Sequence, residues 1–209
     1  VLFAVLLNEL RHLWLKKTIQ TIAYLPHFLS WVILATVVVN VFSYEGPINA
    51  VLEMLGIEPI LFMASNKWFR SVLIVTDVWK GFGYGAIIYL AALSGIDPGL
   101  YEAAAIDGAN RFKRVWHITL PGILPTIMLV TIMNLPNVLN AGFDQIFNLY
   151  NPLVMETADI IDTWVYRVGL VERQYSLGTA VGLLRSIVGI ILMLSANKIA
   201  QKVTDYRIF

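Results

Sequence analysis

Long apolar runs alternate with short polar segments along the whole chain. A helix of about 20 predominantly apolar residues spans the hydrocarbon core of a bilayer, and several runs reach that length. They cover about Thr18–Phe42, Arg70–Leu93, Leu120–Ala141 and Leu177–Ile199. The pattern therefore predicts an all-α, polytopic transmembrane helical bundle.

Proline and helical periodicity refine the first part of this pattern. Pro26 lacks a backbone donor, which predicts a kink in the first span. In the following stretch, residues 43–69, apolar residues recur at helical spacing and predict a short amphipathic helix on the membrane surface. Its apolar positions are Ile48, Val51, Leu52 and Leu55.

The sequence opens on an apolar run, Val1–Leu7, with no basic segment before it and no small-residue cleavage site after it. This is not the pattern of a signal peptide. We interpret the run as the end of a span that begins before residue 1. Residues 1–209 are then expected to form a single transmembrane domain that is incomplete at its N-terminus.

Composition supports a membrane protein. Hydrophobic residues make up 58% of the chain and charged residues 14%, whereas a soluble domain carries about 25% charged residues; the mean hydropathy is +0.71. The net charge of +1 argues against a nucleic-acid partner. The chain has no cysteine, which rules out disulfides and thiolate metal sites, and its three histidines lack metal-ligand spacing.

Basic residues predict the orientation of the spans, because cytoplasmic loops carry an excess of lysine and arginine. Nine basic residues fall on one side of the predicted spans and four on the other. The larger group is Arg11, Lys16, Lys17, Arg111, Lys113, Arg114, Lys198, Lys202 and Arg207, and the smaller group is Lys67, Arg70, Arg167 and Arg173. The loop at about 94–119 is therefore expected to face the cytoplasm, and the acidic loop 144–172 to face outward.

The loop 94–119 has the features of two short helices separated by a glycine. Asp97 and Pro98 are suited to the N-cap and the first helical position. The segment Tyr101–Asp107 is rich in alanine, the strongest helix former. Gly108 can supply the left-handed residue that ends this first helix.

A second helix over about Arg111–Ile118 should end where Pro121 returns the chain to the membrane. Phe112 and Trp116, four residues apart, give this helix one aromatic face. Small side chains on the first helix would let the backbone of another protein approach closely, and Glu102 offers a negative charge to a cation of that protein. We therefore expect residues 94–119 to form a helix–glycine–helix elbow that binds a partner protein.

The spacing within this elbow resembles a known motif. Glu-Ala-Ala at 102–104, a glycine six residues after the glutamate, and Ile-x-Leu-Pro at 118–121 resemble the cytoplasmic coupling loop of binding-protein-dependent ABC importer permeases, which have the type I, maltose-permease-like fold. Four further runs are similar to the polysaccharide and oligosaccharide branch of that family, which includes alginate-type importers. They are Tyr24–Phe28, Trp79–Gly81, Leu149–Pro152 and Asp162–Arg167.

The resemblance implies a role and a set of partners. The chain would be a permease subunit of an ATP-driven importer for an oligosaccharide or polysaccharide, in a bacterial cytoplasmic (inner) membrane. Its partners would be a second permease subunit in a heterodimer, two cytoplasmic ATPase subunits, an extracytoplasmic solute-binding protein and membrane lipid. The residues that match the ATPase-coupling motif or flank it are Glu102, Ala103, Ala104, Asp107, Gly108 and Ala109.

ATP and Mg²⁺ are expected in the partner ATPase subunits. The sequence has no Gly-x-x-x-x-Gly-Lys-Ser/Thr phosphate loop, and Gly81, Gly83 and Gly85 lie inside a predicted span without βαβ context. No nucleophile and base pattern is present, so the chain is predicted to be no enzyme, with no catalytic residue, metal or cofactor of its own. The Gly81–Gly85 pair instead predicts close helix packing.

Three charged residues, Asp77, Lys80 and Arg185, lie inside predicted spans, where an unpaired charge costs about 2.5–3.5 kcal/mol. Asp77 and Lys80 are three residues apart and can meet on one helix face. Two interpretations are open at this point. The charges form a structural ion pair, or they line the path of the solute.

Neighbouring polar and aromatic residues have the same two interpretations. Asn134, Asn137 and Asn140 recur every three residues and can hydrogen-bond a sugar or another helix. Trp79 is a further candidate for the solute path. Aromatic residues of the predicted outer loop can stack on sugars, contact a delivery protein or anchor at the membrane interface. They are Phe143, Phe147, Tyr150, Trp164 and Tyr166.

Two alternative functions are compatible with these patterns. A permease of a related ABC importer for another solute would share the same coupling loop. An ion-coupled secondary transporter would use Asp77 or Lys80 as a relay, and would leave the elbow without a role.

Overall fold

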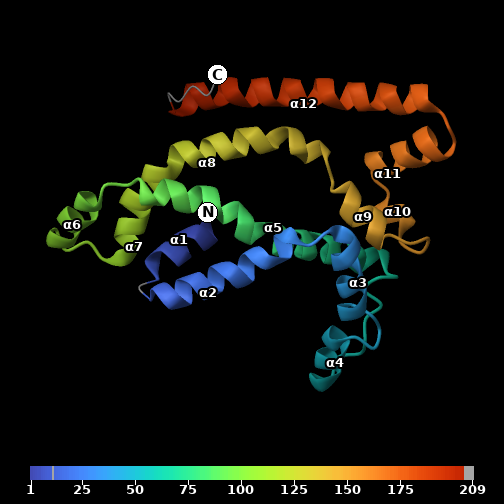
Figure 1. Ribbon diagram of the computed structural model, residues 1–209, viewed down its shortest axis with the longest axis horizontal. Helices are drawn as coiled ribbons and strands as arrows, with labels where there is room; N and C mark the ends of the chain where they lie inside the picture. The colour runs from blue at the N-terminus through green and yellow to red at the C-terminus, as the bar shows by residue number, and fades with distance from the viewer. Residues whose placement is uncertain (11, 205–209) are drawn as a thin grey trace. The chain divides into compact units, whose positions relative to one another are not determined.

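The structure is a computed structural model that describes residues 1–10 and 12–204, with side chains described as far as residue 198. Every element in these residues is a helix (Figure 1). The α-helices are α1 (Leu2–Glu9), α2 (Leu13–Tyr24), α3 (Trp31–Val41), α4 (Pro47–Met54), α5 (Asn66–Ser94), α6 (Pro98–Ile106), α7 (Arg111–Arg114), α8 (Leu120–Asn134), α9 (Phe143–Leu149), α10 (Met155–Ala158), α11 (Ile161–Val165) and α12 (Tyr175–Thr204). The shorter segments are the 3₁₀ helices η1 (Leu25–Phe28) and η3 (Leu135–Leu139), and the π-helices η2 (Val115–Thr119) and η4 (Tyr166–Val171).

Within the part of the chain that the structure describes, three helices are long and apolar enough to cross a membrane, namely Asn66–Ser94, Arg111–Leu139 and Tyr175–Lys198. A fourth crossing results if the bent pair Leu13–Phe28 and Trp31–Val41 is counted as one span. These segments coincide with the four predicted spans, so the predicted all-α transmembrane fold class is confirmed. Two of the basic residues used for orientation, Arg11 and Arg207, lie outside the described residues, as does the side chain of Lys202.

The first span is broken, whereas the sequence predicted a kink. Its pieces, Leu13–Phe28 and Trp31–Val41, are bent by 107°. Pro26 lies in the 3₁₀ segment η1, and Ser30 then caps α3 by accepting a hydrogen bond from the N–H of Ile33 at 3.4 Å. The prediction therefore placed the distortion correctly at Pro26. Because Ser30 supplies a new N-cap, a separate helix begins there in a different direction.

The third span begins earlier than predicted, because the second helix of the elbow continues into it. Residues Arg111–Leu139 form one helical stretch that passes through Pro121. Immediately before this proline the helix widens into η2, where the N–H of Leu120 donates to the carbonyl of Val115, five residues back. The wider turn makes room for a ring that would otherwise collide with the preceding carbonyl. The predicted helix end at Pro121 is therefore wrong.

The chain forms two compact units. Unit 1 consists of residues 1–24, 82–136 and the described residues from 190 onward, and unit 2 consists of 25–81 and 137–189. In unit 1, α1 packs on the second half of α5, with the rings of Phe3 and Phe82 edge to face at 4.9 Å. Ala4, Leu93 and Ile123 are buried in the same apolar cluster. Leu93 and Ile123 belong to the helices that precede and follow the elbow, so this apolar cluster holds the two ends of the elbow together.

Close helix packing in unit 1 occurs at Gly83, whereas the sequence predicted it for Gly81 and Gly85. A Cβ at Gly83 would lie 2.1 Å from the carbonyl oxygen of Ala23, so α5 and α2 touch through their backbones. Nothing lies within 4 Å of a Cβ built at Gly81 or Gly85. The small-residue pattern identified the correct turn and the wrong face, because residues two apart on a helix point about 200° away from each other.

The core of unit 2 gathers α3, α5 and the segments around α9 and α10. Phe69 and Val154 are fully buried in it. Buried Asn49 ties α4 to the neighbouring loops, because its Nδ2 donates to the carbonyls of Ser43 at 3.0 Å and Ile60 at 2.9 Å. Its Oδ1 accepts from the N–H of Ile60 at 2.8 Å, which satisfies the buried amide on both sides.

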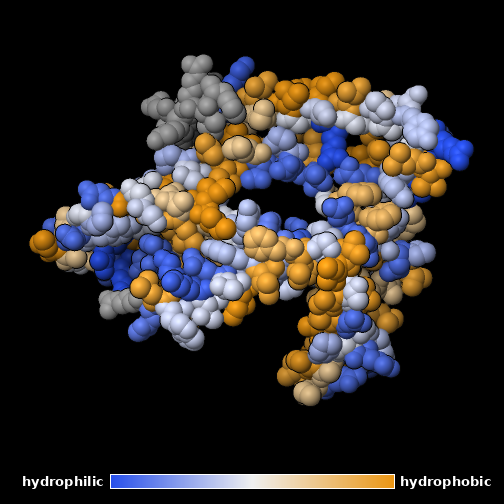
Figure 2. Space-filling view, in the orientation of Figure 1, coloured by the Kyte–Doolittle hydropathy of each residue, from blue (hydrophilic) through white to orange (hydrophobic). Residues whose placement is uncertain are grey.

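Helix α4 confirms the short helix predicted in the segment 43–69. Ile48 and Leu52 pack against the core of unit 2, whereas Val51 and Leu55 are exposed. Figure 2 shows apolar side chains over α3 and α4 and again along α12. The location of α4 on a membrane surface stays a prediction.

Candidate functional site

The first helix of the elbow, α6, begins with a side-chain cap. Asp97 accepts a hydrogen bond from the N–H of Gly99 at 2.8 Å, and Pro98 occupies the first turn. Asp97 therefore satisfies a donor that the helix leaves open, and Pro98 has no donor to lose. The alanine-rich segment is helical as predicted and ends at Ile106, with Asp107 as its C-cap.

Gly108 turns the chain after α6 in the left-handed conformation, with φ +75°. Its N–H donates to the carbonyl of Ala105 at 3.2 Å, and the N–H of Ala109 donates to the carbonyl of Ala104 at 2.9 Å. These bonds satisfy carbonyls that would be open at the helix C-terminus. A residue with a Cβ is strained in this conformation, so the turn depends on glycine.

Hydrogen bonds also fix the rest of the elbow. Asn110 caps α7 by accepting from the N–H of Lys113 at 2.8 Å. The hydroxyls of Tyr101 and Thr119 lie 3.0 Å apart and join α6 to the end of η2, and Thr119 is buried. Figure 1 shows α6 and α7 extending together from unit 1. The elbow is thus a braced element and can move as one piece.

The elbow presents its motif residues together with large apolar side chains. Phe112 and Trp116 stack with ring centroids 6.3 Å apart, as their spacing predicted. Leu100 and Ile106 are 52% and 87% exposed, and no periodicity in the sequence marked them. Among the motif residues, Glu102, Ala103, Asp107 and Gly108 are exposed, and Ala104 and Ala109 are half-buried. Exposed apolar groups of this size are typical of a surface that binds another protein.

Lys80 lies at the break in the first span. Its ammonium group donates to the carbonyl oxygens of Leu29 at 2.7 Å, His27 at 2.8 Å and Pro26 at 3.3 Å, and lies 5.7 Å from the ring centroid of Trp31. Carbonyls at a helix end have no partner further along the helix. A cation there supplies donors and also matches the negative end of the helix dipole. The geometry favours the structural interpretation of Lys80.

The predicted pair of Asp77 with Lys80 is not formed, since the ion pairs recorded among the described residues lie elsewhere. Asp77 instead lines a cavity of about 520 Å³ in unit 2, together with Asn140. Arg70 and Gln145 line the same cavity, and sequence reasoning did not single them out as site residues. They come from segments about 70 residues apart, and such proximity leaves no trace in a single sequence.

The three asparagines do not form one stripe. Helix α8 ends at Asn134, Asn137 lies in the 3₁₀ segment η3, and Asn140 follows that segment. Asn134 donates to the carbonyl of Val130 at 2.8 Å. The change of helix type alters the angle between successive residues, so equal spacing in sequence does not give one face. A contact of these residues, or of the exposed Trp79, with a solute stays a prediction.

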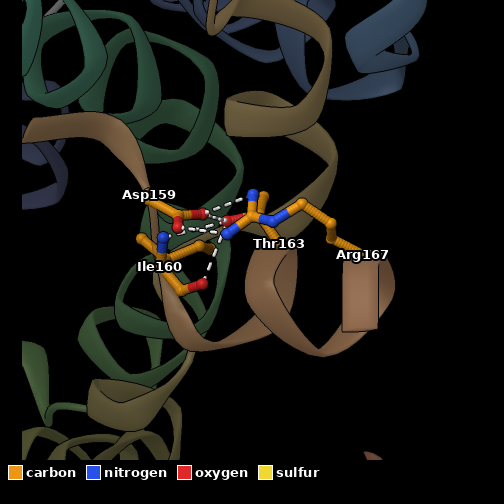
Figure 3. A network of polar contacts seen from close by, with 4 residues as sticks. All are labelled: Asp159, Ile160, Thr163 and Arg167. Carbon is orange, nitrogen blue, oxygen red and sulfur yellow. Dashed lines mark hydrogen bonds and ion pairs between the residues drawn. The ribbon is translucent and has the colours of Figure 1, made fainter. Parts of the chain in front are cut away.

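Asp159 and Arg167 form an ion pair where α11 begins, with Oδ2 and Nη2 2.6 Å apart (Figure 3). Thr163 donates to Asp159 Oδ1 at 2.7 Å and accepts from the N–H of Ile160 at 2.9 Å. These hydrogen bonds, first among them the one from Arg167, hold the pKa of the Asp159 carboxyl below its ordinary value. The network fixes one wall of the 520 Å³ cavity, which Asp159 also lines.

Replacing Arg167 by glutamine should lower the free energy of unfolding at neutral pH by about 1 kcal/mol or less, because the ion pair is partly exposed. Since pairing lowers the pKa of Asp159 in the folded state, its contribution is present above the ordinary pKa of about 3.9 and is lost as the pH falls through the folded-state pKa. Thermal unfolding in detergent should therefore separate variant from wild type at neutral pH, and the difference should shrink progressively as the pH falls below about 3.9. Arg173→Gln, at an exposed arginine, is the control, and a difference that does not shrink in acid would contradict the assignment.

Comparison with known proteins places the chain among transporters. Residues 1–205 match the family described as "Binding-protein-dependent transport system inner membrane component". Protein LplB of Bacillus subtilis is 44% identical over 210 residues, a match that covers 100% of this chain and 66% of LplB. The polygalacturonan/rhamnogalacturonan transport system permease protein YteP of the same organism is 41% identical over 210 residues. This match covers 100% of this chain and 65% of YteP. The chain thus spans just under two thirds of the length of these relatives.

Two solved structures are also similar. The first is a crystal structure of a bacterial ABC transporter involved in the import of the acidic polysaccharide alginate, with a TM-score of 0.93 and 40% identity over 97% of this chain and 71% of that chain. The second is a crystal structure of a bacterial alginate ABC transporter in complex with alginate pentasaccharide-bound periplasmic protein. It has a TM-score of 0.94 and 39% identity, and the match covers 99% of this chain and 72% of that chain. The predicted type I importer fold is thereby confirmed. The chain belongs to the family of inner membrane components of binding-protein-dependent transport systems.

Proposed function

We propose that the chain is a permease subunit of an ATP-driven, solute-binding-protein-dependent importer for oligosaccharides or polysaccharides. The match of residues 1–205 to the importer family carries the proposal. The substrate class is supported by 40% identity to a chain of an alginate importer and 41% identity to a polygalacturonan/rhamnogalacturonan permease. Alginate, polygalacturonan and rhamnogalacturonan are all acidic polysaccharides, so chains that contain uronate units are the favoured substrates.

In this proposal the elbow, residues 94–119, binds a cytoplasmic ATPase subunit. Glu102 offers a carboxylate to a cation of that partner, and the small side chains around Gly108 allow close approach. The caps at Asp97 and Asn110 keep both short helices intact, so a displacement of the partner is passed on and is not absorbed in a flexible loop. ATP and Mg²⁺ bind in the two ATPase subunits, and the permease needs no catalytic group.

Transport then follows from two arrangements of a permease heterodimer that expose a common site to opposite sides of the membrane. The solute-binding protein delivers the saccharide from outside, and the cavity lined by Asp77 and Asn140 supports a polar path through unit 2. An ion-coupled secondary transporter receives less support. Three carbonyls already engage Lys80, and the braced elbow would have no role.

The protein purified in mild detergent from its own membrane should bring with it a second permease and a cytoplasmic ATPase. Reconstituted in vesicles with a saccharide-loaded binding protein, this complex should accumulate saccharide only when ATP is hydrolysed. Uptake that depends on an ion gradient and proceeds without ATP would contradict the proposed function. ATP-driven uptake of a different solute would leave the importer class intact and remove the saccharide assignment.

A further inference from the structure

A second cavity in unit 2, of about 370 Å³, combines aromatic rings with an ion pair. Phe143 and Tyr166 form part of its lining, and Asp162 and Arg185 form another part. Its volume lies within the about 300–1,000 Å³ that is typical of small-molecule sites. We refer to the cavity lined by these four residues as the Tyr166 pocket.

The aromatic part of the Tyr166 pocket is held in place by ring packing. The Tyr166 ring lies 5.8 Å from that of Phe143 and 4.9 Å from that of Phe147. Phe143 stacks on Phe147 at 5.1 Å, and Phe147 also contacts Tyr150 at 6.1 Å. Rings fixed by several neighbours lose little freedom when a ligand stacks on them. The aromatic surface is therefore organised before a ligand arrives.

The polar part of the Tyr166 pocket is an ion pair between Asp162 of α11 and Arg185, which lies inside a candidate membrane span. Arg185 Nη1 donates to Asp162 Oδ1, and the side chains are 24% and 22% exposed. Arg185 follows Tyr175, the first residue of α12, by ten positions, so it lies about 15 Å along the helix. Ionisable groups at such depth face protein or a water-filled cavity and commonly mark a solute pathway.

Pairing leaves much of this polar surface available. A guanidinium group has five N–H donors and a carboxylate accepts at about four positions, and a single hydrogen bond joins Arg185 to Asp162. Asn140 also lines the pocket, and its Oδ1 accepts from the N–H of Gly142 at 3.3 Å. The pocket therefore offers both donors and acceptors to the hydroxyl groups of a sugar.

A pyranose ring has the two complementary surfaces, an apolar C–H face and a rim of hydroxyls. We propose that the Tyr166 pocket binds one sugar unit of the transported saccharide. The ring face lies on Tyr166 and Phe143, and the hydroxyls bind Asp162 and Arg185. This inference rests on the proposed function and adds a specificity-determining site in this subunit, which lies outside the elbow and shares only Asn140 with the lining of the cavity of Asp77.

The absence of cysteine from residues 1–209 allows a direct test, because an introduced cysteine is the only thiol in this part of the protein. Leu170 lines the Tyr166 pocket and is 60% exposed, whereas its neighbour Val171 is 62% exposed and is not part of the lining. Leu170→Cys and Val171→Cys are each assembled into the transporter in vesicles. Modification by a maleimide is followed as a mass shift of this chain, with ATP and a binding protein that is either empty or loaded with saccharide.

At a saccharide concentration ten times the dissociation constant, the unoccupied fraction and hence the labelling rate of Leu170→Cys should fall about tenfold. Val171→Cys should label equally with the empty and the loaded binding protein. In the Leu170→Cys background, Tyr166→Ala should remove the protection and Tyr166→Phe should keep it. The double change of Asp162→Asn and Arg185→Gln, which leaves no unpaired charge, should weaken it.

Unprotected Leu170→Cys, or equal protection of both cysteines, would overturn the proposal. The same preparation separates this failure from a failure of the proposed function. If the transporter imports saccharide with ATP and Leu170→Cys labels at an unchanged rate, only the assignment of the Tyr166 pocket is wrong. If the transporter imports no saccharide at all, the proposed function is wrong, and the assignment of a sugar to the Tyr166 pocket is wrong as well.

Discussion

Replacing Gly108 by valine should reduce saccharide-stimulated ATP hydrolysis by the assembled transporter about tenfold or more. The left-handed conformation costs a residue with a Cβ roughly 1–2 kcal/mol, and more for a β-branched one. Nothing lies within 4 Å of a Cβ at this position, so the cost is backbone strain and not collision. Unwinding the end of α6 relieves the strain and breaks the hydrogen bonds of Gly108 and Ala109. A shift of 1.4 kcal/mol is a tenfold change in the population of the intact elbow.

Gly56 provides a matched control for this experiment. It has the same φ of +75°, nothing lies within 4 Å of an added Cβ, and it lies outside the elbow. Gly56→Val should therefore cost similar folding stability, measured by thermal unfolding, and leave stimulated ATP hydrolysis unchanged. If both variants lose stimulation equally, the loss reflects general destabilisation. If Gly108→Val keeps normal stimulation, the elbow is not the coupling element.

Replacing Lys80 by methionine should destabilise the protein by on the order of 2–4 kcal/mol. Methionine preserves the length and the apolar stem of the side chain and removes the ammonium group. The carbonyls of Pro26, His27 and Leu29 then lose their donor, and water does not readily replace it within a span. Thermal unfolding in detergent should show a lower transition, and limited proteolysis should cut first near the break at residues 25–30.

Lys67→Met is the control for the Lys80 variant. Lys67 lies on the same helix and its Nζ is 5.7 Å from the ring centroid of Trp68, the same distance that separates Lys80 from Trp31. It is exposed, so its loss should change stability by no more than about 0.5 kcal/mol. The difference between the two variants therefore isolates the carbonyl hydrogen bonds. Equal and small effects would show that the break holds without the cation.

Local chemistry made the elbow predictable from sequence. Asp97, Gly108 and the pair Phe112 and Trp116 each act on residues within four positions of themselves, and the structure has them in the predicted geometry. The spans were equally clear, because a run of about 20 apolar residues has few alternatives to a membrane helix. Short-range capping, turn and hydropathy rules thus gave both the fold class and the shape of the elbow.

Contacts between distant residues were not predictable in the same way. Lys80 reaches carbonyls more than 50 positions away, and Arg185 pairs with a partner 23 positions away. The sequence shows that a charge inside a span needs a partner, but spacing along one helix pointed to Asp77. The end of the helix at Pro121 was predicted wrongly because a π-helical turn, which accommodates the proline ring, has no signal in the residue pattern.

The continuous helical stretch from Arg111 to Leu139 joins the second half of the elbow to the third span without a loop. At 1.5 Å per residue its 29 residues measure about 43 Å, which is longer than a bilayer core is thick. One end belongs to the elbow, and the other precedes Asn140, which lines the 520 Å³ cavity and the Tyr166 pocket. Every residue from Arg111 to Leu139 is helical, so the backbone offers no loop in this stretch at which a rotation of the elbow would be absorbed.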